Sequence, residues 1–162
     1  MVNDLTVTLF GREALNKQMS FKDTLSLLQE LDLINIGELA EKAIAKKTGS
    51  KQMGKGNEGY DLENGWEIKH GQAHLNARET QRSAYIAGMQ NKTGTLRVVI
   101  TERLTGQLYF FKVPFDAYKN YRTSSLQWAF EVDGSPRRIP KAATSRPCYW
   151  DFEVENFNEL CS

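Results

Sequence analysis

Two carboxylates and a lysine stand close together near the middle of this 162-residue chain. Glu67 and Lys69 are two positions apart in a segment that alternates like a β-strand, so their side chains share one face. Asp61 precedes them on the other arm of an expected hairpin. Such a group offers oxygen ligands beside a positive charge, and Mg²⁺ prefers sites of this kind, completed by water and phosphate oxygens. A metal held there can activate water and stabilise charge on a phosphodiester.

Whether the two acids meet depends on the turn at Asn64-Gly65, a strong hairpin signal. A two-residue loop would point Asp61 and Glu67 to opposite faces. A three-residue loop over 63–65, closed by a left-handed glycine, would place them opposite each other. Only the second register brings both acids and the lysine together, and distortion of the first strand would serve equally well. The three-residue loop is therefore part of the hypothesis.

Hydrophobic periodicity predicts the elements that must position this group. Helices are expected over residues 20–34, 36–48, 77–89 and 114–121. Strands are expected over residues 59–63, 66–69, 96–101, 108–113, 126–132 and 149–154. In the second helix an apolar stripe should face the core, formed by Ile36, Leu39, Ala40, Ala43 and Ile44. The pattern predicts an α/β (α+β) protein with a mixed β-sheet flanked by helices.

The composition is that of an ordinary globular domain, with 40% hydrophobic and 25% charged residues and a net charge of +1. It excludes a histone-like polycation, and a chain of this length needs no disulfide or metal to form a core. Cys148 and Cys161 are too few for a disulfide scaffold or a zinc finger. No apolar run approaches a membrane span and no signal pattern opens the chain. We expect one reduced, cytoplasmic domain over residues 1–162 without a membrane partner.

The charge is unevenly distributed along the chain. Residues 70–146 carry twelve basic and five acidic side chains, a net charge of +7. Eight of the bases are arginines on separate segments, and the planar guanidinium fork suits phosphates and guanine edges. A basic surface for nucleic acid and an ordinary solvated surface both agree with this pattern.

The segment around the acids resembles a known family. The chain reads Gly56-Asn57-Glu58-Gly59-Tyr60-Asp61 and then Glu67-Ile68-Lys69. This resembles the P-D…(D/E)-x-K signature of the nuclease superfamily that contains most type II restriction endonucleases, and in particular a small, blunt-cutting, homodimeric member. Tyr60 replaces the proline, and the gap between the two acids is short. The resemblance covers residues 35–72 and implies a restriction-endonuclease-like fold.

The resemblance implies a role for each matching residue. Asp61 and Glu67 would bind Mg²⁺, with Mn²⁺ able to substitute, and the carbonyl of Ile68 would complete the coordination. Lys69 would contact the attacked phosphate and water, and Glu58 would serve a second ion or hold a water. The helix before the hairpin often supplies a further acid in this family, for which Glu38 or Glu41 is the candidate.

The same resemblance implies a Mg²⁺-dependent, sequence-specific endonuclease that cuts double-stranded DNA to leave 5′-phosphate and 3′-hydroxyl ends. Such enzymes act as homodimers on palindromic sites, and a companion DNA methyltransferase would act on the same site. Residues 1–34 form the candidate dimerisation region, because the first helix has more leucines than one core face uses. Residues 35–72 would hold the catalytic helix and hairpin, and residues 73–162 would complete the sheet and contact DNA.

Polar residues after the catalytic strand are candidates for DNA contacts, because they carry donors suited to base edges or phosphates. The candidates are Gln72, His74, Asn76, Arg78 and Arg82, together with Arg137 and Arg138 on a Pro-flanked arm. A solvent-exposed loop is the alternative for the first group. A zinc pair of His70 and His74 is disfavoured because glycine and strand sequence argue against a helix there.

Two other classes of function remain open. One is another nuclease of the same superfamily, such as a homing or phage enzyme or an RNA-cutting toxin. The other is a nucleic-acid-binding module without catalysis, in which the Glu-x-Lys group is a surface ion pair.

Overall fold

A computed structural model describes residues 21–54, 59–139 and 149–162. The chain divides into two compact units, residues 1–36 and 37–162, and the first nearly coincides with the region 1–34 predicted for dimerisation. In the first unit, α2 (Phe21–Glu30) is shorter than expected. It ends because Asp32 takes a left-handed conformation (φ 54°) and the Leu33 N–H donates to the Leu28 carbonyl at 2.9 Å.

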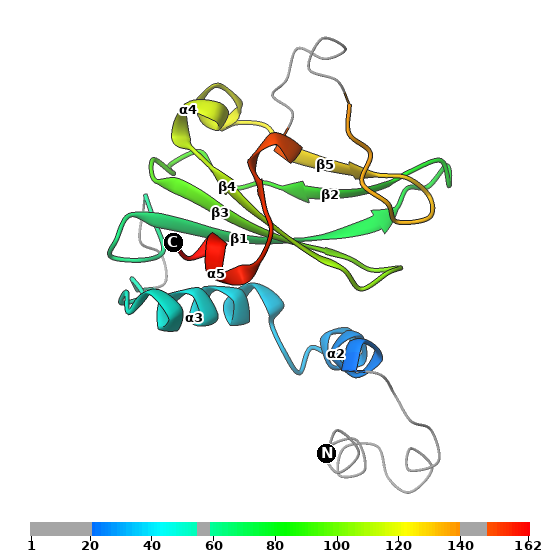
Figure 1. The fold of residues 1–162 in the computed structure, drawn as a ribbon, viewed down its shortest axis with the longest axis horizontal. Coiled ribbons are helices and arrows are strands. Elements are labelled where there is room, and N and C mark those ends of the chain that lie inside the picture. Colours follow the sequence, from blue (N-terminus) through cyan, green and yellow to red (C-terminus); the bar gives the residue numbers. More distant parts are fainter. Residues whose placement is uncertain (1–20, 55–58, 140–148) are drawn as a thin grey trace, which may run out of the picture. The chain divides into compact units, whose positions relative to one another are not determined.

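The second unit is built on one six-stranded mixed sheet of order β5-β2-β1-β3-β4-β6 (Figure 1). Its strands are β1 (Trp66–Leu75), β2 (Arg82–Ile86), β3 (Thr95–Glu102), β4 (Leu108–Val113), β5 (Leu126–Phe130) and β6 (Glu153–Val154). Strands β1 and β3 pair in parallel, and the other neighbours are antiparallel. The helices are α3 (Ile36–Thr48), α4 (Phe115–Tyr118) and α5 (Phe157–Leu160), with short 3-10 turns at Lys119–Tyr121 and Tyr149–Phe152. The predicted mixed α/β class is confirmed.

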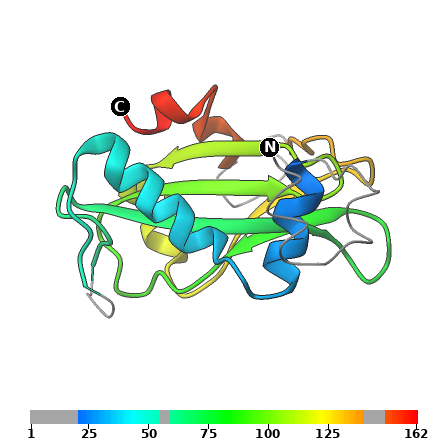
Figure 2. The same cartoon turned by 90° about the horizontal axis from the view of Figure 1, so that it is seen from below.

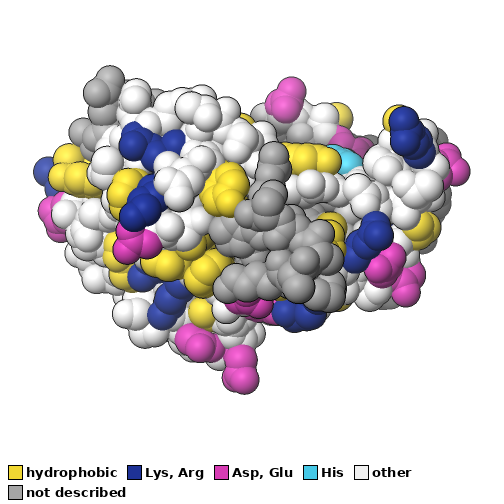
Figure 3. Space-filling model, turned by 90° about the horizontal axis from the view of Figure 1, so that it is seen from above, with side chains coloured by type: hydrophobic (Ala, Val, Ile, Leu, Met, Phe, Trp, Pro, Cys, Tyr) yellow, Lys and Arg dark blue, Asp and Glu magenta, His cyan; other side chains and the backbone are white. Residues whose placement is uncertain are grey.

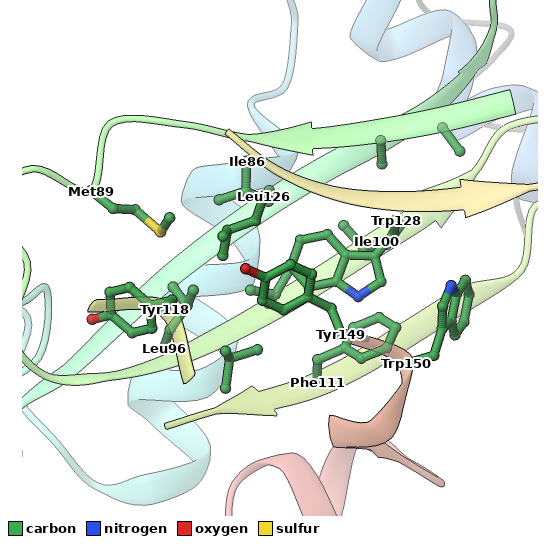
Figure 4. Close-up of a cluster of buried hydrophobic side chains, with 14 of the residues drawn as sticks. Ile86, Met89, Leu96, Ile100, Phe111, Tyr118, Leu126, Trp128, Tyr149 and Trp150 are labelled. Atoms are coloured by element: carbon green, nitrogen blue, oxygen red, sulfur yellow. The ribbon is translucent and has the colours of Figure 1, made fainter. Parts of the chain in front are cut away.

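The two faces of the sheet bury two separate cores. Along β3, Leu96, Val98 and Ile100 enter the larger core, whereas Val99 enters the smaller one. The larger core is aromatic, with Phe111, Trp128, Tyr149 and Trp150 packed ring to ring (Figure 4). Strand alternation decides which core each side chain meets.

Helix α3 covers the face of the smaller core, as Figure 2 shows. It buries Ile44 and Ala45 against the sheet, whereas Leu39 is 45% exposed. The predicted stripe is therefore confirmed at Ala40 and Ile44, which face the smaller core, and wrong at Leu39 and Ala43, which are exposed. Both helix ends are where they were predicted, and Gly49 closes the helix with φ 67°.

The helix predicted over 77–89 is wrong, because this segment forms β2 in the interior of the sheet. Strand β1 is also longer than the strand predicted over 66–69 and runs to Leu75. Gly71 lies inside it, and a Cβ there would stand 2.9 Å from Ile86 Cδ1 and 3.0 Å from Ile100 Cδ1. Close packing requires this glycine, not a turn.

Two other predicted strands are only partly present. Residues 59–63 form no strand, and Leu62 makes a single antiparallel bridge to Gln52. In the segment 149–154 a 3-10 turn precedes the two-residue β6. The strands predicted over 96–101, 108–113 and 126–132 are confirmed as β3, β4 and a shorter β5. No helix in the described part of the chain has the length and apolar character that crossing a membrane requires.

Candidate active site at the start of the central strand

The turn before β1 has the three-residue register. The N–H of Gly65 donates to the Leu62 carbonyl at 2.9 Å, and the N–H of Leu62 donates to the Trp66 carbonyl at 3.0 Å. Gly65 is left-handed with φ 85°. These bonds define a type I turn closed by a glycine bulge, so the two-residue alternative is excluded. Glu63 lies exposed in the turn and accepts a hydrogen bond from the Lys51 N–H at 3.1 Å.

Asp61 is drawn to β1 by two hydrogen bonds. Its N–H donates to the Trp66 carbonyl at 2.9 Å, and its Oδ2 accepts the N–H of Ile68 at 2.8 Å. The second bond brings a half-buried carboxylate to the peptide that follows Glu67. Asp61 and Glu67 are thus neighbours, as the predicted register requires, although the first arm is not a strand.

Glu67 and Lys69 lie on the face of the larger core. Ala73, on the same side of the pleat, belongs to that core, whereas Ile68 belongs to the smaller one. The side chain of Glu67 is fully buried. Its Oε1 is 2.7 Å from the Lys69 Nζ, and its Oε2 is 2.9 Å from the Nζ of Lys92.

The carboxylate of Glu67 is charge-paired but incompletely hydrogen-bonded. Neither of its oxygens accepts a hydrogen bond of ordinary geometry from any residue that the structure describes. Burial raises the pKa of Glu67 above its usual value of 4.5, although the ammonium groups of Lys69 and Lys92 act in the opposite direction. A buried carboxylate in this condition has lone pairs available for a cation.

Lys92 was missed by the sequence analysis. It lies in the loop between β2 and β3, and its Nζ is also 3.9 Å from Asp61 Oδ1. No local motif marks it. The parallel pairing of β1 and β3, with Trp66 opposite Thr95, carries this loop to the start of β1. Only the pairing of β1 with β3 indicates that Lys92 reaches the site, and the sequence analysis did not predict this pairing.

Tyr118 was also missed, and it lies beside the same carboxylate. Its hydroxyl donates to the Gly94 carbonyl at 2.7 Å. Burial and the charge of Glu67 raise the pKa of Tyr118 to about 12. Its ring is in the larger core near Met89 and Leu96, as Figure 4 shows.

The donors fit one hard cation in type, though their number is small. Asp61 and Glu67 provide carboxylate oxygens, and the unsatisfied oxygens of Glu67 are the observation that favours a cation. Among the described residues, no group of three or more His, Cys, Asp or Glu side chains could hold a metal ion. The predicted Glu58 lies outside the described residues. Ile68 meets Asp61 through its N–H, and coordination by its carbonyl remains an expectation.

The acids of α3 are engaged elsewhere. Glu38 pairs with Lys42 at 2.8 Å, and the Oε1 of Glu41 accepts from Gln52 Nε2 at 2.9 Å. The helix packs on the face of the sheet opposite to Glu67.

Several predicted DNA contacts lie away from the acids. On β1, Gln72 and His74 alternate with Ala73 and so face away from the larger core. At about 3.3 Å per residue, His74 lies roughly 20 Å along the strand from Glu67. Asn76 shapes the turn that follows, because its Oδ1 accepts the Thr80 N–H at 2.9 Å. In the same turn Arg78 is exposed.

The two histidines cannot share a metal ion. Four residues apart on a strand, His70 and His74 are separated by roughly 13 Å. The Nε2 of His70 lies 2.9 Å from the Thr101 hydroxyl, and burial lowers its pKa to about 4. Burial and neighbouring arginines also lower the pKa of His74.

Arg82, which was also predicted to contact DNA, is only 8% exposed and forms an ion pair with the fully buried Glu102. Arg137 and Arg138 do reach the surface. Arg137 donates to Gln81 Oε1 at 2.9 Å, and Arg138 pairs with Glu153 while its guanidinium lies 5.0 Å from the Trp150 ring.

Comparison of the chain with family models, with curated proteins and with solved structures gives no match.

Proposed function

We propose that this protein is a Mg²⁺-dependent endonuclease that hydrolyses phosphodiesters of double-stranded DNA to 5′-phosphate and 3′-hydroxyl ends. The observation that carries the proposal is the fully buried Glu67, which lies beside Asp61 and whose oxygens are paired with two lysine ammonium groups and with no other donor among the described residues. Burying a carboxylate is costly, and a site that binds a cation gives a reason for it.

Asp61 and Glu67 would hold the ion, and the bound ion would lower the pKa of a water and neutralise charge on the phosphate. Lys69 would lie beside the attacked phosphate, since its ammonium is 2.7 Å from Glu67 and remains partly exposed. Its charge would act mainly in the transition state. The proposed fold is restriction-endonuclease-like, supported by a mixed sheet whose inner strand β1 carries these residues.

The proposed DNA surface adjoins the site. Tyr118 connects α4 to the loop of Lys92, and Arg122 donates to the Met89 carbonyl at 3.3 Å in that loop. Figure 3 shows lysine and arginine side chains among hydrophobic and acidic ones on one face of the molecule. Homodimers on palindromic sites and a cytoplasmic restriction role belong to the same proposal, with α2 as the candidate interface.

A second candidate is a nucleic-acid-binding module without catalysis. The observation that favours it is that each oxygen of Glu67 already faces a lysine ammonium, at 2.7 and 2.9 Å. An ion-paired cluster of this kind can be purely structural.

Incubating the purified protein with supercoiled plasmid, in Mg²⁺ or in EDTA, separates these functions. The proposal predicts cleavage in Mg²⁺ that EDTA stops. Discrete fragments would indicate sequence-specific restriction, and a smear would indicate a nonspecific nuclease. A mobility shift without cleavage in Mg²⁺ or Mn²⁺ would reject the nuclease and favour the binding module. Asp61→Asn should stop cleavage while leaving DNA binding intact, because phosphate contacts elsewhere supply most of the affinity.

A further inference from the structure

The ammonium of Lys92 bridges the two carboxylates of the candidate site. It is 2.9 Å from Glu67 Oε2 and 3.9 Å from Asp61 Oδ1. The side chain is only 14% exposed. A single positive charge thus stands where the two acids converge, and Lys69 touches only one of them, at 2.7 Å.

The backbone that carries Lys92 is anchored at both ends. The N–H of Lys92 donates to the Met89 carbonyl at 3.1 Å, and that carbonyl also accepts from Arg122 Nε at 3.3 Å. At the other end the Gly94 carbonyl accepts the hydroxyl of Tyr118 at 2.7 Å. The loop is therefore fixed, while the four-carbon side chain keeps its own rotational freedom.

At Gly94 this loop is in direct contact with the turn that precedes β1. A Cβ on Gly94 would stand 1.9 Å from the Gly65 carbonyl oxygen, closer than any side chain allows. Thr93 adds a contact, since its N–H lies 3.4 Å from the Gly59 carbonyl. The loop of Lys92 and the hairpin of Asp61 are thus held in direct backbone contact.

We propose that Lys92 is the resident counter-ion of Asp61 and Glu67 in the metal-free protein, and that a divalent cation displaces its ammonium from the two carboxylates. The inference rests on the proposed function and assigns Lys92 a part in it. Once displaced, the ammonium becomes a donor for a phosphate of the substrate.

The charges at the site favour this exchange. Two neighbouring carboxylates, one of them fully buried, need a compensating cation. Mg²⁺ bonds its oxygens at 2.0–2.1 Å, so an ion on Glu67 Oε2 would lie within about 4 Å of the ammonium that is 2.9 Å from the same oxygen, and the two positive charges would repel each other. Metal binding therefore competes with Lys92, and a bound nucleic acid, by offering its phosphate to the ammonium, strengthens metal binding.

Calorimetric titration with Mn²⁺ in the absence of nucleic acid tests this directly. Lys92→Met should bind Mn²⁺ about tenfold more tightly than the wild type, because a competing charge within about 4 Å has been removed. Lys42→Met is the matched control, since Lys42 pairs with Glu38 on the opposite face and its loss should leave the affinity unchanged. Lys92→Met should also lose most plasmid cleavage.

Equal or weaker Mn²⁺ binding by Lys92→Met, with a wild type that binds Mn²⁺ and cuts DNA, would overturn the role of Lys92 alone. No Mn²⁺ binding by either protein, with no cleavage, would overturn the proposed function as well. Lys92→Gln serves if the methionine variant does not fold. In the unmodified protein carrying ¹³C at lysine Cε, Mg²⁺ should shift the signal of Lys92 and leave that of Lys42 in place, and an unmoved Lys92 signal would contradict displacement.

Discussion

Among the described residues of the second unit, Glu67 and Glu102 are the two glutamates that are completely buried, and their surroundings differ. Glu102, at the end of β3, pairs with Arg82 and accepts the Thr105 N–H at 2.7 Å. Burial alone would raise the pKa of Glu102, but the hydrogen bonds from Thr105 and Arg82 outweigh it and hold the pKa below 4.5. Glu67, at the start of β1, has a raised pKa, and among the described residues its carboxylate oxygens are paired only with the ammonium groups of Lys69 and Lys92.

The difference separates a structural charge from one available to a ligand. Glu102 has its lone pairs satisfied by the protein, so the fold depends on it. Glu67 is held only by charge, from lysine side chains that keep some exposure to solvent. Burial by itself does not identify a functional acid, whereas burial without hydrogen bonds does so more sharply.

The largest expected effect is on stability. Glu102→Gln should lower the free energy of unfolding by about 3–5 kcal/mol, because it leaves the charge of Arg82 buried without a partner. Glu67→Gln should lower it by less, because Lys92 keeps Asp61 within 3.9 Å and the Lys69 side chain is partly exposed. Urea unfolding monitored by tryptophan fluorescence measures both. Equal losses in the two variants would make Glu67 a structural residue and remove the contrast.

A smaller effect on stability is expected at Gly134, which packs against the carboxylate of Glu102. A Cβ there would stand 2.6 Å from Glu102 Oε2, and the residue has φ 86°. Gly134→Ala should cost about 2 kcal/mol, from the left-handed backbone and the crowded carboxylate together. Gly49→Ala is the matched control, because it has φ 67° and nothing within 4 Å of the added Cβ. In thermal melting, Gly134→Ala should have a lower melting temperature than Gly49→Ala. An equal loss in the two variants would show that the Glu102 side chain moves aside without a cost in stability.

The smallest effect is in the pH dependence of stability, and its sign differs between the two acids. The stabilisation from Glu102, whose pKa is lowered, is present above pH 4.5 and is lost as the pH falls through the folded pKa. For Glu67, whose pKa is raised, stability is lost as the pH rises from 4.5 through the folded pKa. Unfolding in urea at a series of pH values measures this. In Glu67→Gln the free energy of unfolding should no longer fall as the pH rises above 4.5. If it still falls in that variant, a group other than Glu67 causes the loss.

Local chemistry was enough to predict the part of the site that lies within one hairpin. The glycine after Asn64 demanded a turn, and alternation put Glu67 and Lys69 on one face. Strand β3 was predicted because Val98, Val99 and Ile100 form a continuous apolar run, as expected for a strand buried on both faces.

What could not be predicted depends on pairing between distant segments. Nothing near Lys92 indicates that it reaches Glu67, because the parallel register of β1 and β3 brings it there. In the same way Arg82 looked like a surface base until Glu102 was placed opposite it. Segment 77–89 was misread because its strand is stabilised by two neighbours in the sheet and not by its own periodicity.

Single-turnover cleavage of supercoiled plasmid at saturating Mg²⁺, with Glu67→Gln compared with Glu63→Gln, tests the central claim most directly. Both changes remove one negative charge from the same hairpin, but Glu63 is exposed in the turn and only Glu67 faces the lysines. The account predicts that Glu67→Gln slows cleavage by a factor of about a thousand or more, while Glu63→Gln stays within about threefold of the wild type. Cleavage by Glu67→Gln at the wild-type rate would contradict it.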